Sequence, residues 1–206
     1  MVELIERRGV SDRRVLTAMR AVPRHLFVPY ASAVHAYGDH PLPIGGGQTI
    51  SQPYVVAAMT EAARVLPGER VLEVGTGSGY QAALLAAVGA KVFSIERVAE
   101  HVERARQNLR AARVPDVVLR AGDGFDGWLE QAPFAAILVT AAAPRVPEPL
   151  WSQLAEGGRL VLPLGPPNDV QQLEVHVKRA GGDRVERLFP VRFVPMLGLV
   201  QEAPSE

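Results

Sequence analysis

Cysteine is absent from the 206-residue sequence, so disulfides, thiolate nucleophiles and cysteine-zinc sites are excluded. Net charge is absent as well, because 22 basic residues balance 22 acidic ones. A neutral chain has no overall field to hold nucleic acid or an anionic membrane, although a local patch is not excluded. The longest strongly apolar run, residues 134–143, is far shorter than the roughly 20 residues that span a bilayer, and the charged start lacks an apolar signal-peptide stretch. These absences predict a soluble cytoplasmic protein with neither nucleic acid nor membrane as a partner.

Short apolar runs alternate with helical patterns through the middle of the chain. Strands are predicted at residues 70–74, 91–95, 117–119, 134–139 and 159–162, and helices at residues 79–88, 98–113 and 147–154. This alternation predicts right-handed crossovers and a doubly wound, mostly parallel α/β sheet with helices on both faces. After residue 167, the alternating segments 172–178 and 185–194 flank a Gly-Gly-Asp turn and predict a C-terminal antiparallel strand pair.

The first 50 residues do not follow this alternation. They show helical patterns at residues 3–8 and 12–19, followed by a loop rich in proline and glycine. A chain of this length suits one domain. We therefore predict a single domain over residues 1–206, in which residues 1–50 form an N-terminal helical cover and lid loop and residues 51–206 form the α/β core.

A glycine-rich turn closes the first predicted strand and opens the next helix. Its candidate ligand-binding residues are Glu73, Gly75, Thr76, Gly77, Ser78 and Gly79. Glycines permit a tight turn and let the backbone approach a ligand closely, although such turns also occur without a ligand. The acidic Glu73 would oppose a pyrophosphate at the helix N-terminus. It suits instead a cationic ligand, such as the sulfonium and ammonium groups of S-adenosylmethionine.

Two further acidic positions follow the next two predicted strands. Glu96 lies 21 residues after Gly75, where an acid can accept both ribose hydroxyls; its alternative role is a favourable charge near the start of the following helix. Asp123, followed by Gly124, can accept a hydrogen bond from an adenine amino group; its alternative role is a turn residue before glycine. Because the carboxyl ends of parallel strands share one edge of the sheet, these positions predict one nucleoside site.

Four distinctive segments lie far apart in the chain. They are PIGGGQTISQPYVVAAM at residues 43–59, AVPRHLFVP at 21–29, VLEVGTGSGYQAA at 71–83 and VRFVPMLG at 191–198. Together they resemble the protein-L-isoaspartate (D-aspartate) O-methyltransferase family; the glycine turn alone indicates only a methyltransferase, whereas GQTISQP and VRFVP are specific. The resemblance implies a class I methyltransferase (Rossmann-like) fold and S-adenosylmethionine as donor, with S-adenosylhomocysteine as product. It also implies damaged proteins or peptides with L-isoaspartyl, and by extension D-aspartyl, residues as acceptors.

The acceptor group that the resemblance implies is the free α-carboxylate of an isoaspartyl residue, which is ionised at neutral pH and needs no general base. Its reaction with a sulfonium cation removes charge, so the site should orient it with neutral donors and exclude water. The resemblance gives this role to the hydroxyl of Ser51. Because Ser51 precedes Gln52, Pro53 and an apolar-periodic run, it is also predicted to be a helix N-cap, and both roles can hold.

Other residues complete the predicted site. Gln48 and Thr49 share the loop of Ser51 and are expected to contact the cofactor, as is Thr140 at the end of the fourth strand. Glycines at positions 45–47 would let this loop close as a lid. The resemblance gives Val194 backbone contacts to an extended peptide; the alternative is a plain core strand residue.

The five histidines have no HxxxH pair and no carboxylate cluster beside them, so we predict no metal. We expect a monomer. Two alternatives to the isoaspartyl methyltransferase are another class I methyltransferase that acts on a small molecule or RNA, and a protein that binds S-adenosylmethionine without catalysis. The GQTISQP segment argues against the first, and the presence of Ser51 argues against the second.

Overall fold

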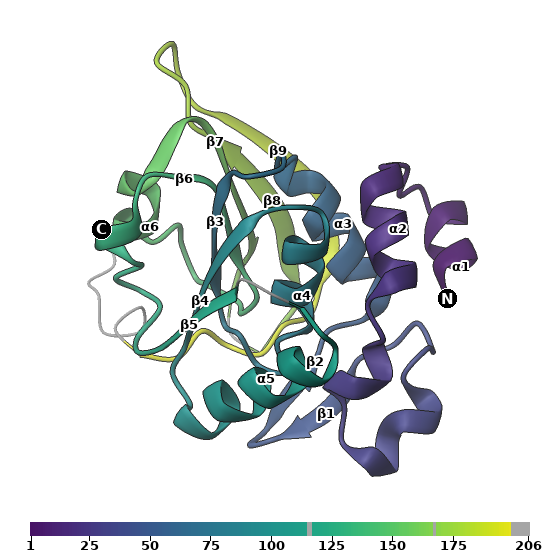
Figure 1. Cartoon of the computed structure of the whole chain (residues 1–206). Coiled ribbons are helices and arrows are strands. Elements are labelled where there is room, and N and C mark those ends of the chain that lie inside the picture. The colour runs from purple at the N-terminus through teal and green to yellow at the C-terminus, as the bar shows by residue number, and fades with distance from the viewer. Residues whose placement is uncertain (115–116, 167, 199–206) are drawn as a thin grey trace.

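A seven-stranded sheet forms the centre of the computed structural model, which describes residues 1–114, 117–166 and 168–198 (Figure 1). Its strands are β3 (Arg70–Val74), β4 (Lys91–Glu96), β5 (Val117–Ala121), β6 (Phe134–Val139), β7 (Leu154–Leu164), β8 (Gln171–Val177) and β9 (Arg184–Val191). Their order is β5-β4-β3-β6-β7-β8-β9, with parallel pairing from β5 to β7 and antiparallel pairing from β7 to β9. The predicted parallel sheet with a closing antiparallel pair is therefore confirmed.

The chain changes direction across the sheet at β3. From β3 it runs outward through β4 to β5, and then returns past β3 to β6 on the other side. A crevice opens outside the carboxyl ends of the strands where the order reverses in this way, and ligands of open α/β sheets bind there. The topology thus fixes where a site should lie before any side chain is considered.

Helices cover both faces of the sheet. Their bounds are α1 (Val2–Arg7), α2 (Arg13–Ala21), α3 (Pro53–Ala63), α4 (Tyr80–Ala87), α5 (Ala99–Ala111) and α6 (Glu148–Ser152). Met59 of α3 and Leu85 of α4 pack with Val71 on one face, whereas Leu150 of α6 packs with Leu72 on the other (Figure 1). Burial on both faces explains why β6 reads as a continuous apolar run.

The N-terminal cover differs in part from its prediction. Helices α1 and α2 lie within about a residue or two of the predicted bounds at the N-terminal end of the chain, beside α3 (Figure 1). The expected irregular loop, however, contains the 3-10 helices Arg24–Phe27 and Tyr30–His35 and an antiparallel hairpin of β1 (Leu42–Gly45) and β2 (Gln48–Ile50). The hairpin forms because Leu42 and Ile50 pair and bury their side chains, while Gly46 and Gly47 take the positive φ angles of the turn.

Three predicted boundaries were wrong. The strand expected at residues 159–162 begins five residues earlier, at Leu154. The helix expected over residues 147–154 ends at Ser152, because Leu154 already belongs to the long strand β7. The last strand ends at Val191 and does not reach Val194. Beyond Val191 the backbone leaves the β8 ladder: Phe193 N donates to the side chain of Gln171 (2.8 Å), and the Val194 carbonyl accepts from Ala142 N (2.8 Å). This turn away from β8 brings Val194 to the carboxyl end of β6.

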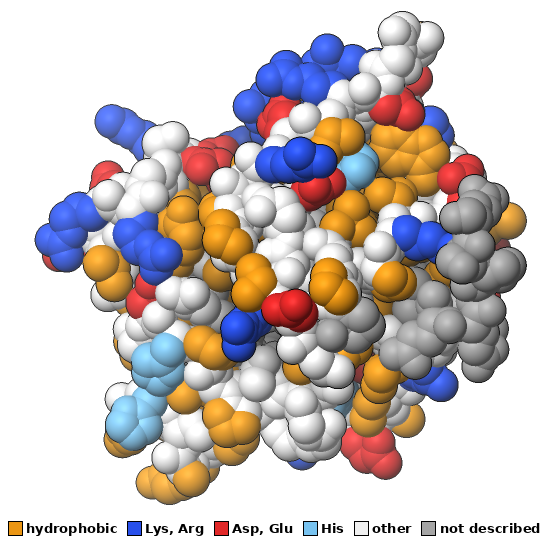
Figure 2. Space-filling model, turned by 180° about the vertical axis from the view of Figure 1, so that it is seen from behind, with side chains coloured by type: hydrophobic (Ala, Val, Ile, Leu, Met, Phe, Trp, Pro, Cys, Tyr) orange, Lys and Arg blue, Asp and Glu red, His pale blue; other side chains and the backbone are white. Residues whose placement is uncertain are grey.

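Charged side chains of both signs are interspersed with apolar ones on the face drawn in Figure 2. Oppositely charged side chains also form pairs in the structure, including Arg159 with Glu186 (3.1 Å) and Arg187 with Glu174 (3.1 Å). Within residues 1–114, 117–166 and 168–198, no helix combines the length and the apolar character needed to cross a membrane.

Candidate cofactor and acceptor site

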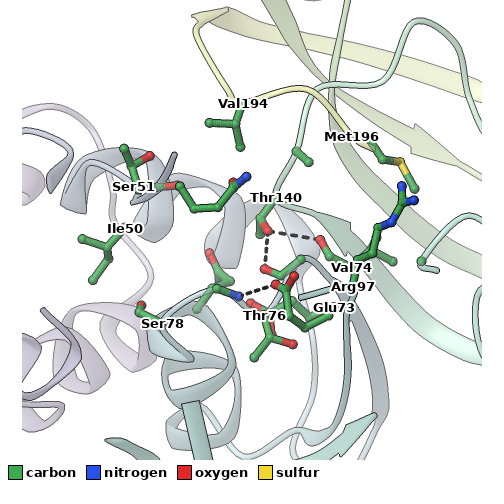
Figure 3. Close-up of a pocket in the computed structure, with 18 of the residues that line it drawn as sticks. Ile50, Ser51, Glu73, Val74, Thr76, Ser78, Arg97, Thr140, Val194 and Met196 are labelled. Atoms are coloured by element: carbon green, nitrogen blue, oxygen red, sulfur yellow. Dashed lines mark hydrogen bonds between the residues drawn. The ribbon is translucent and has the colours of Figure 1, made fainter. Parts of the chain in front are cut away.

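A cavity lies at the carboxyl ends of β3, β4 and β6, where the topology predicts a site (Figure 3). Counted together with the open space at its mouth, it has a volume of about 950 Å³. The structure brings most of the predicted site residues to its walls: Gln48, Thr49, Ser51, Glu73, Gly75, Thr76, Gly77, Ser78, Glu96, Gly124, Thr140 and Val194. Gln48 and Val194, which are 146 positions apart in the sequence, therefore meet around one space.

The glycine turn depends on the absence of side chains. Gly75 has φ 96°, and a Cβ there would lie 2.5 Å from Thr140 Oγ1. That hydroxyl donates to the carbonyls of Gly75 (2.6 Å) and Val74 (3.1 Å), so Thr140 fastens the turn to β6 (Figure 3). Thr140 therefore lines the cavity as predicted, but its hydroxyl is already used by the backbone.

Glu96 is buried at the end of β4 and accepts two backbone hydrogen bonds. Its Oε2 accepts from Gly77 N (2.8 Å), and its Oε1 accepts from Val98 N (2.9 Å) at the N-cap of α5. The alternative expected from sequence, a charge near the start of the helix, is thus present in the structure. Because each carboxylate oxygen can accept more than one hydrogen bond, both oxygens keep capacity for a ribose hydroxyl.

Glu73 is completely buried in the wall of the cavity. Ser94 Oγ donates to its Oε2 (2.5 Å), and Ser94 also contacts Thr76 Oγ1 (2.6 Å). Its Oε1 has no partner among the described residues, and the same holds for the buried Oε1 of Gln81, which also lines the cavity. Burial, reinforced by the negative charge of Glu96, raises the pKa of Glu73 to about 8.

Ser51 lies at the start of α3, but it is not the N-cap of this helix. That position belongs to Gln52, whose side chain makes no capping bond; Pro53 occupies N1, and the N–H of Tyr54 in the first turn donates instead to Asp39 Oδ1 (2.9 Å). The predicted capping role of Ser51 was therefore wrong. Within the described part of the chain its hydroxyl makes no hydrogen bond, while its carbonyl accepts from Arg24 Nη2 (2.8 Å).

Arg24 is a buried cation that the sequence did not single out. It donates from Nε to the Ala36 carbonyl (2.9 Å) and from Nη2 to the Ser51 carbonyl, and it stacks 4.8 Å from the ring centre of Tyr80. Burial lowers the pKa of Arg24 to about 10 and raises the pKa of Tyr80 to about 12, so at neutral pH Arg24 stays charged and Tyr80 neutral. Arg24 ties the N-terminal cover to the loop that carries Ser51.

A second hollow adjoins the cavity along β9. The two spaces share Thr49, Ser51, Thr140 and Val194 as lining residues. The remaining walls of this hollow, called here the β9 groove, are mainly aromatic and apolar, with two arginines at the edge; they include Arg8, Tyr54, Phe189, Val191, Arg192 and Phe193. Ser51 and Val194 therefore lie where the cavity and the β9 groove meet, and face each other across it (Figure 3).

Two predicted cofactor residues do not line the cavity. Gly79, at the N-cap of α4, lies under Ala105 of α5, and a Cβ there would come within 3.2 Å of the Ala105 side chain. Asp123 accepts from Phe125 N (2.9 Å), as a turn aspartate does, and its Oδ2 lies beside Gly198. Gly79 thus serves close helix packing, and the adenine contact of Asp123 stays a prediction.

Several lining residues were missed in the sequence. They are Ile50, Val56, Met59, Val74, Tyr80, Gln81, Ile95, Arg97, Val98, Ala141, Pro195, Met196 and Leu197. Most of them adjoin a predicted residue, so proximity in sequence is the signal that could have found them. Among the described residues, no group of three or more His, Asp or Glu side chains is arranged to hold a metal ion.

Comparison with known proteins places this chain in a family. The family model described as protein-L-isoaspartate(D-aspartate) O-methyltransferase matches residues 1–201. The chain belongs to this family. A protein-L-isoaspartate O-methyltransferase of Gloeobacter violaceus is 51% identical over 204 residues, covering 99% of this chain and 98% of the relative. The expected family membership is thereby confirmed.

Solved structures agree with the fold. A protein-L-isoaspartate O-methyltransferase superimposes with a TM-score of 0.84 at 29% identity, and covers 97% of this chain and 65% of its own. A putative member from Plasmodium falciparum, in complex with S-adenosyl-L-homocysteine, gives a TM-score of 0.81 at 28% identity over 95% of this chain and 96% of its own. The class I methyltransferase fold expected from the resemblance is confirmed.

The cavity fits a nucleoside cofactor with a cationic portion. The glycine turn leaves its backbone close to the cavity, Glu96 retains acceptor capacity, and two buried acceptors, Glu73 Oε1 and Gln81 Oε1, lack donors. Buried polar atoms without partners are rare in folded proteins and point to a missing ligand or water. S-adenosylmethionine supplies ribose hydroxyls, an ammonium and a sulfonium, the donors and charge that these residues lack.

Proposed function

We propose that this protein transfers a methyl group from S-adenosylmethionine to the free α-carboxylate of L-isoaspartyl residues in damaged proteins and peptides, with D-aspartyl residues as a second acceptor class. Family membership supports the reaction, and one observation of the site carries the assignment of residues. The hydroxyl of Ser51 has no hydrogen bond to the described residues and lies where the cavity meets the β9 groove. A donor held in the cavity and a carboxylate held in the groove would meet at this hydroxyl.

The chemistry needs orientation more than activation. When bound, S-adenosylmethionine supplies a methyl group on a positively charged sulfur. Ser51 donates its hydroxyl to one oxygen of the acceptor carboxylate and leaves the other oxygen free to attack. Because charge disappears as the new O–CH₃ bond forms, a neutral donor holds the carboxylate without stabilising its ground state as strongly as a cation would. This explains why the described residues that line both spaces include the Ser51 hydroxyl and no charged side chain.

The nucleoside end of the cavity needs a charged hydrogen-bond acceptor, whereas the acceptor end needs a neutral donor. Glu96 accepts the ribose hydroxyls with the capacity left on its two oxygens, while its bonds to Gly77 N and Val98 N keep it fixed. Gln48, Thr49, Thr76 and Ser78 supply further polar groups from the hairpin and the glycine turn. Donor binding therefore depends on groups that the backbone already orients, which lowers the entropic cost of binding.

The β9 groove selects the acceptor by the path of its backbone. An extended peptide along residues 191–194 and Ser51 would find apolar walls, and Val194 would offer it the backbone contacts that the family resemblance implies. An isoaspartyl residue carries its chain through the side-chain carbon, so its free carboxylate has a different position from that of a normal aspartate. A displacement of about 1 Å is enough to lower a transfer rate strongly.

The protein acts as a single domain over residues 1–206 and as a monomer in the cytoplasm. Its acceptors are proteins and peptides, and it acts on neither nucleic acid nor membranes.

Methyl transfer to a matched pair of peptides tests this function. One short flexible peptide contains L-isoaspartate and the other contains L-aspartate at the same position, so their atoms and charges are identical. With radiolabelled S-adenosylmethionine we expect label in the isoaspartyl peptide and almost none in its partner. The product is a carboxyl ester, so mild base should release the label as methanol. Base-stable label would indicate a different methyltransferase, and cofactor binding without transfer to any acceptor would indicate a binding protein.

A further inference from the structure

The carboxyl group of Glu73 is fully buried, and no positively charged side chain among the described residues acts on it. The groups that face it are Ser94 and Glu96 from β4, together with the backbone N–H of Ala82 on α4. Tyr80 and Gln81 of α4 line the same part of the cavity, and both are uncharged at neutral pH. Glu96 is therefore the only charge that acts on Glu73 within the described structure, and it has the same sign.

A buried carboxyl group in such surroundings favours its neutral form. Removing a carboxylate from water is costly unless a cation or several donors compensate; among the described residues Ser94 Oγ is the one side-chain donor, the backbone N–H of Ala82 adds only a weaker stabilisation, and no hydrogen bond reaches Oε1. The pKa of about 8 that burial produces means that Glu73 holds a proton at neutral pH in the protein alone. A positive charge that enters the cavity would reverse this preference, because an opposite charge nearby stabilises the ionised form.

Hydroxyl groups connect Glu73 to the cavity. Thr76 lines the cavity, its Oγ1 lies 2.6 Å from Ser94 Oγ, and Ser94 Oγ lies 2.5 Å from Glu73 Oε2. Each hydroxyl can donate or accept, so the row of oxygens can serve either charge state of the carboxyl group and can pass a proton along its length. Glu73 itself has no exposed surface, and this row leads from it to Thr76, which lines the cavity.

We propose that Glu73 couples the charge of the methyl donor to a proton: its carboxyl group is neutral in the free protein, loses its proton when a sulfonium cation binds, and regains one after methyl transfer. The inference rests on the proposed function for the identity of the cation. In transfer the S–CH₃ bond breaks, its electron pair stays on sulfur, and the new bond joins the methyl group to the acceptor oxygen. The sulfur is then neutral, so Glu73 takes up a proton from water through Ser94 and Thr76. Glu73 is thus a determinant of donor-over-product selectivity.

This coupling makes donor binding depend on pH in a way that product binding does not. Below the pKa of free Glu73, about 8, the cation must displace a proton, so its affinity rises as the pH rises toward that value. The limiting slope is about tenfold in Kd per pH unit for one proton. S-adenosylhomocysteine carries the same ammonium and carboxylate but no sulfonium charge, so its affinity should change much less. The ratio of product Kd to donor Kd should therefore increase from pH 6 to pH 8.

Isothermal titration calorimetry of the full chain tests the coupling. At pH 7, titrations in buffers of different ionisation enthalpy give the number of protons released on binding. We expect close to one proton for S-adenosylmethionine and close to none for S-adenosylhomocysteine. Glu73→Gln should remove the difference, whereas Glu174→Gln, a buried glutamate that already pairs with Arg187, should preserve it.

Equal proton release for both ligands, or a difference that persists in Glu73→Gln, would overturn the proposal. Should that variant fail to fold, infrared difference spectra of the wild-type protein decide the matter. The band of a protonated carboxyl group should disappear when S-adenosylmethionine binds and remain when S-adenosylhomocysteine binds; its presence in both complexes would also overturn the proposal. Failure of both ligands to bind would instead contradict the proposed function.

Discussion

The donor side and the acceptor side of the site are held in place by different kinds of contact. On the donor side, the glycine turn and Glu96 follow adjacent strands, and backbone N–H groups of Gly77 and Val98 fix the carboxylate. On the acceptor side, Ser51 depends on the buried side chain of Arg24, and Val194 on a bond to Ala142 across the sheet. The donor-side residues therefore lie in strand-to-helix turns at the ends of adjacent strands, joined by a Gly77–Glu96 bond that spans 19 residues, whereas the acceptor-side bonds span 27 and 52 residues.

Glu96→Ala should give the largest effect, and only on the donor side. The change removes two charge-assisted hydrogen bonds to the ribose, each worth about 1.5–3 kcal/mol. We expect the Kd for S-adenosylhomocysteine to rise at least about a hundredfold in calorimetry. Glu130→Ala, which removes an exposed glutamate paired loosely with Arg120, is a control that should leave the Kd unchanged. An unchanged Kd in Glu96→Ala would show that Glu96 does not bind the ribose, and would contradict the description of the donor side given above.

Glu73 should make the stability of the donor side dependent on pH. Its pKa is raised to about 8 by burial, so the folded state binds more protons than the unfolded state between pH 4.5 and pH 8. The stabilisation is complete below the unfolded pKa and is lost as the pH rises through the folded pKa. The free energy of unfolding should fall by up to about 1.4 kcal/mol per pH unit in this window, and chemical denaturation of Glu73→Gln should show a flatter profile. Parallel profiles for the two proteins would show that Glu73 is ionised throughout.

How far the sequence predicts each side follows from the same difference. The strands, the glycine turn and Glu96 were recognised because β3 and β4 each end in a short, local signal. Arg24 was missed because nothing near it in sequence indicates a buried cation; its partners, Ala36 and Ser51, are 12 and 27 residues away.

The wrong capping assignment of Ser51 has a related cause. A serine before an apolar run resembles an N-cap, but Pro53 moves the cap to Gln52, whose side chain bonds to Asp39 instead (2.9 Å). The end of β9 was likewise set by Gln171 and Ala142, which lie outside the strand. Local sequence patterns carry no information about such partners.

Arg24→Met should damage the acceptor side more than the donor side. It leaves the carbonyls of Ala36 and Ser51 without donors and removes the stacking on Tyr80, for an expected loss of about 2–4 kcal/mol in the free energy of unfolding. The KM for an isoaspartyl peptide should rise while the Kd for S-adenosylhomocysteine changes little. The matched control is Arg20→Met, whose arginine is exposed and lies 3.8 Å from Glu6. Similar losses in the free energy of unfolding in both variants would show that the buried contacts of Arg24 contribute no more than those of an exposed arginine.

Ser51→Ala removes a single hydroxyl where the cavity meets the β9 groove. It therefore tests the point where donor and acceptor meet with the smallest structural change. Because the hydroxyl is not a cap and has no partner in the described structure, stability should change by less than about 0.5 kcal/mol. The loss of one hydrogen bond to a charged acceptor, about 1.5–3 kcal/mol, should slow methyl transfer roughly ten- to a hundredfold.

The decisive measurement is a single-turnover transfer from S-adenosylmethionine to the isoaspartyl peptide by wild-type protein and Ser51→Ala, both saturated with donor. If Ser51 orients the acceptor where the cavity meets the β9 groove, the transfer step slows by this factor while the Kd for S-adenosylhomocysteine and the midpoint of unfolding stay at their wild-type values. A transfer rate equal to that of the wild type, or a loss fully accounted for by weaker donor binding, would contradict the account.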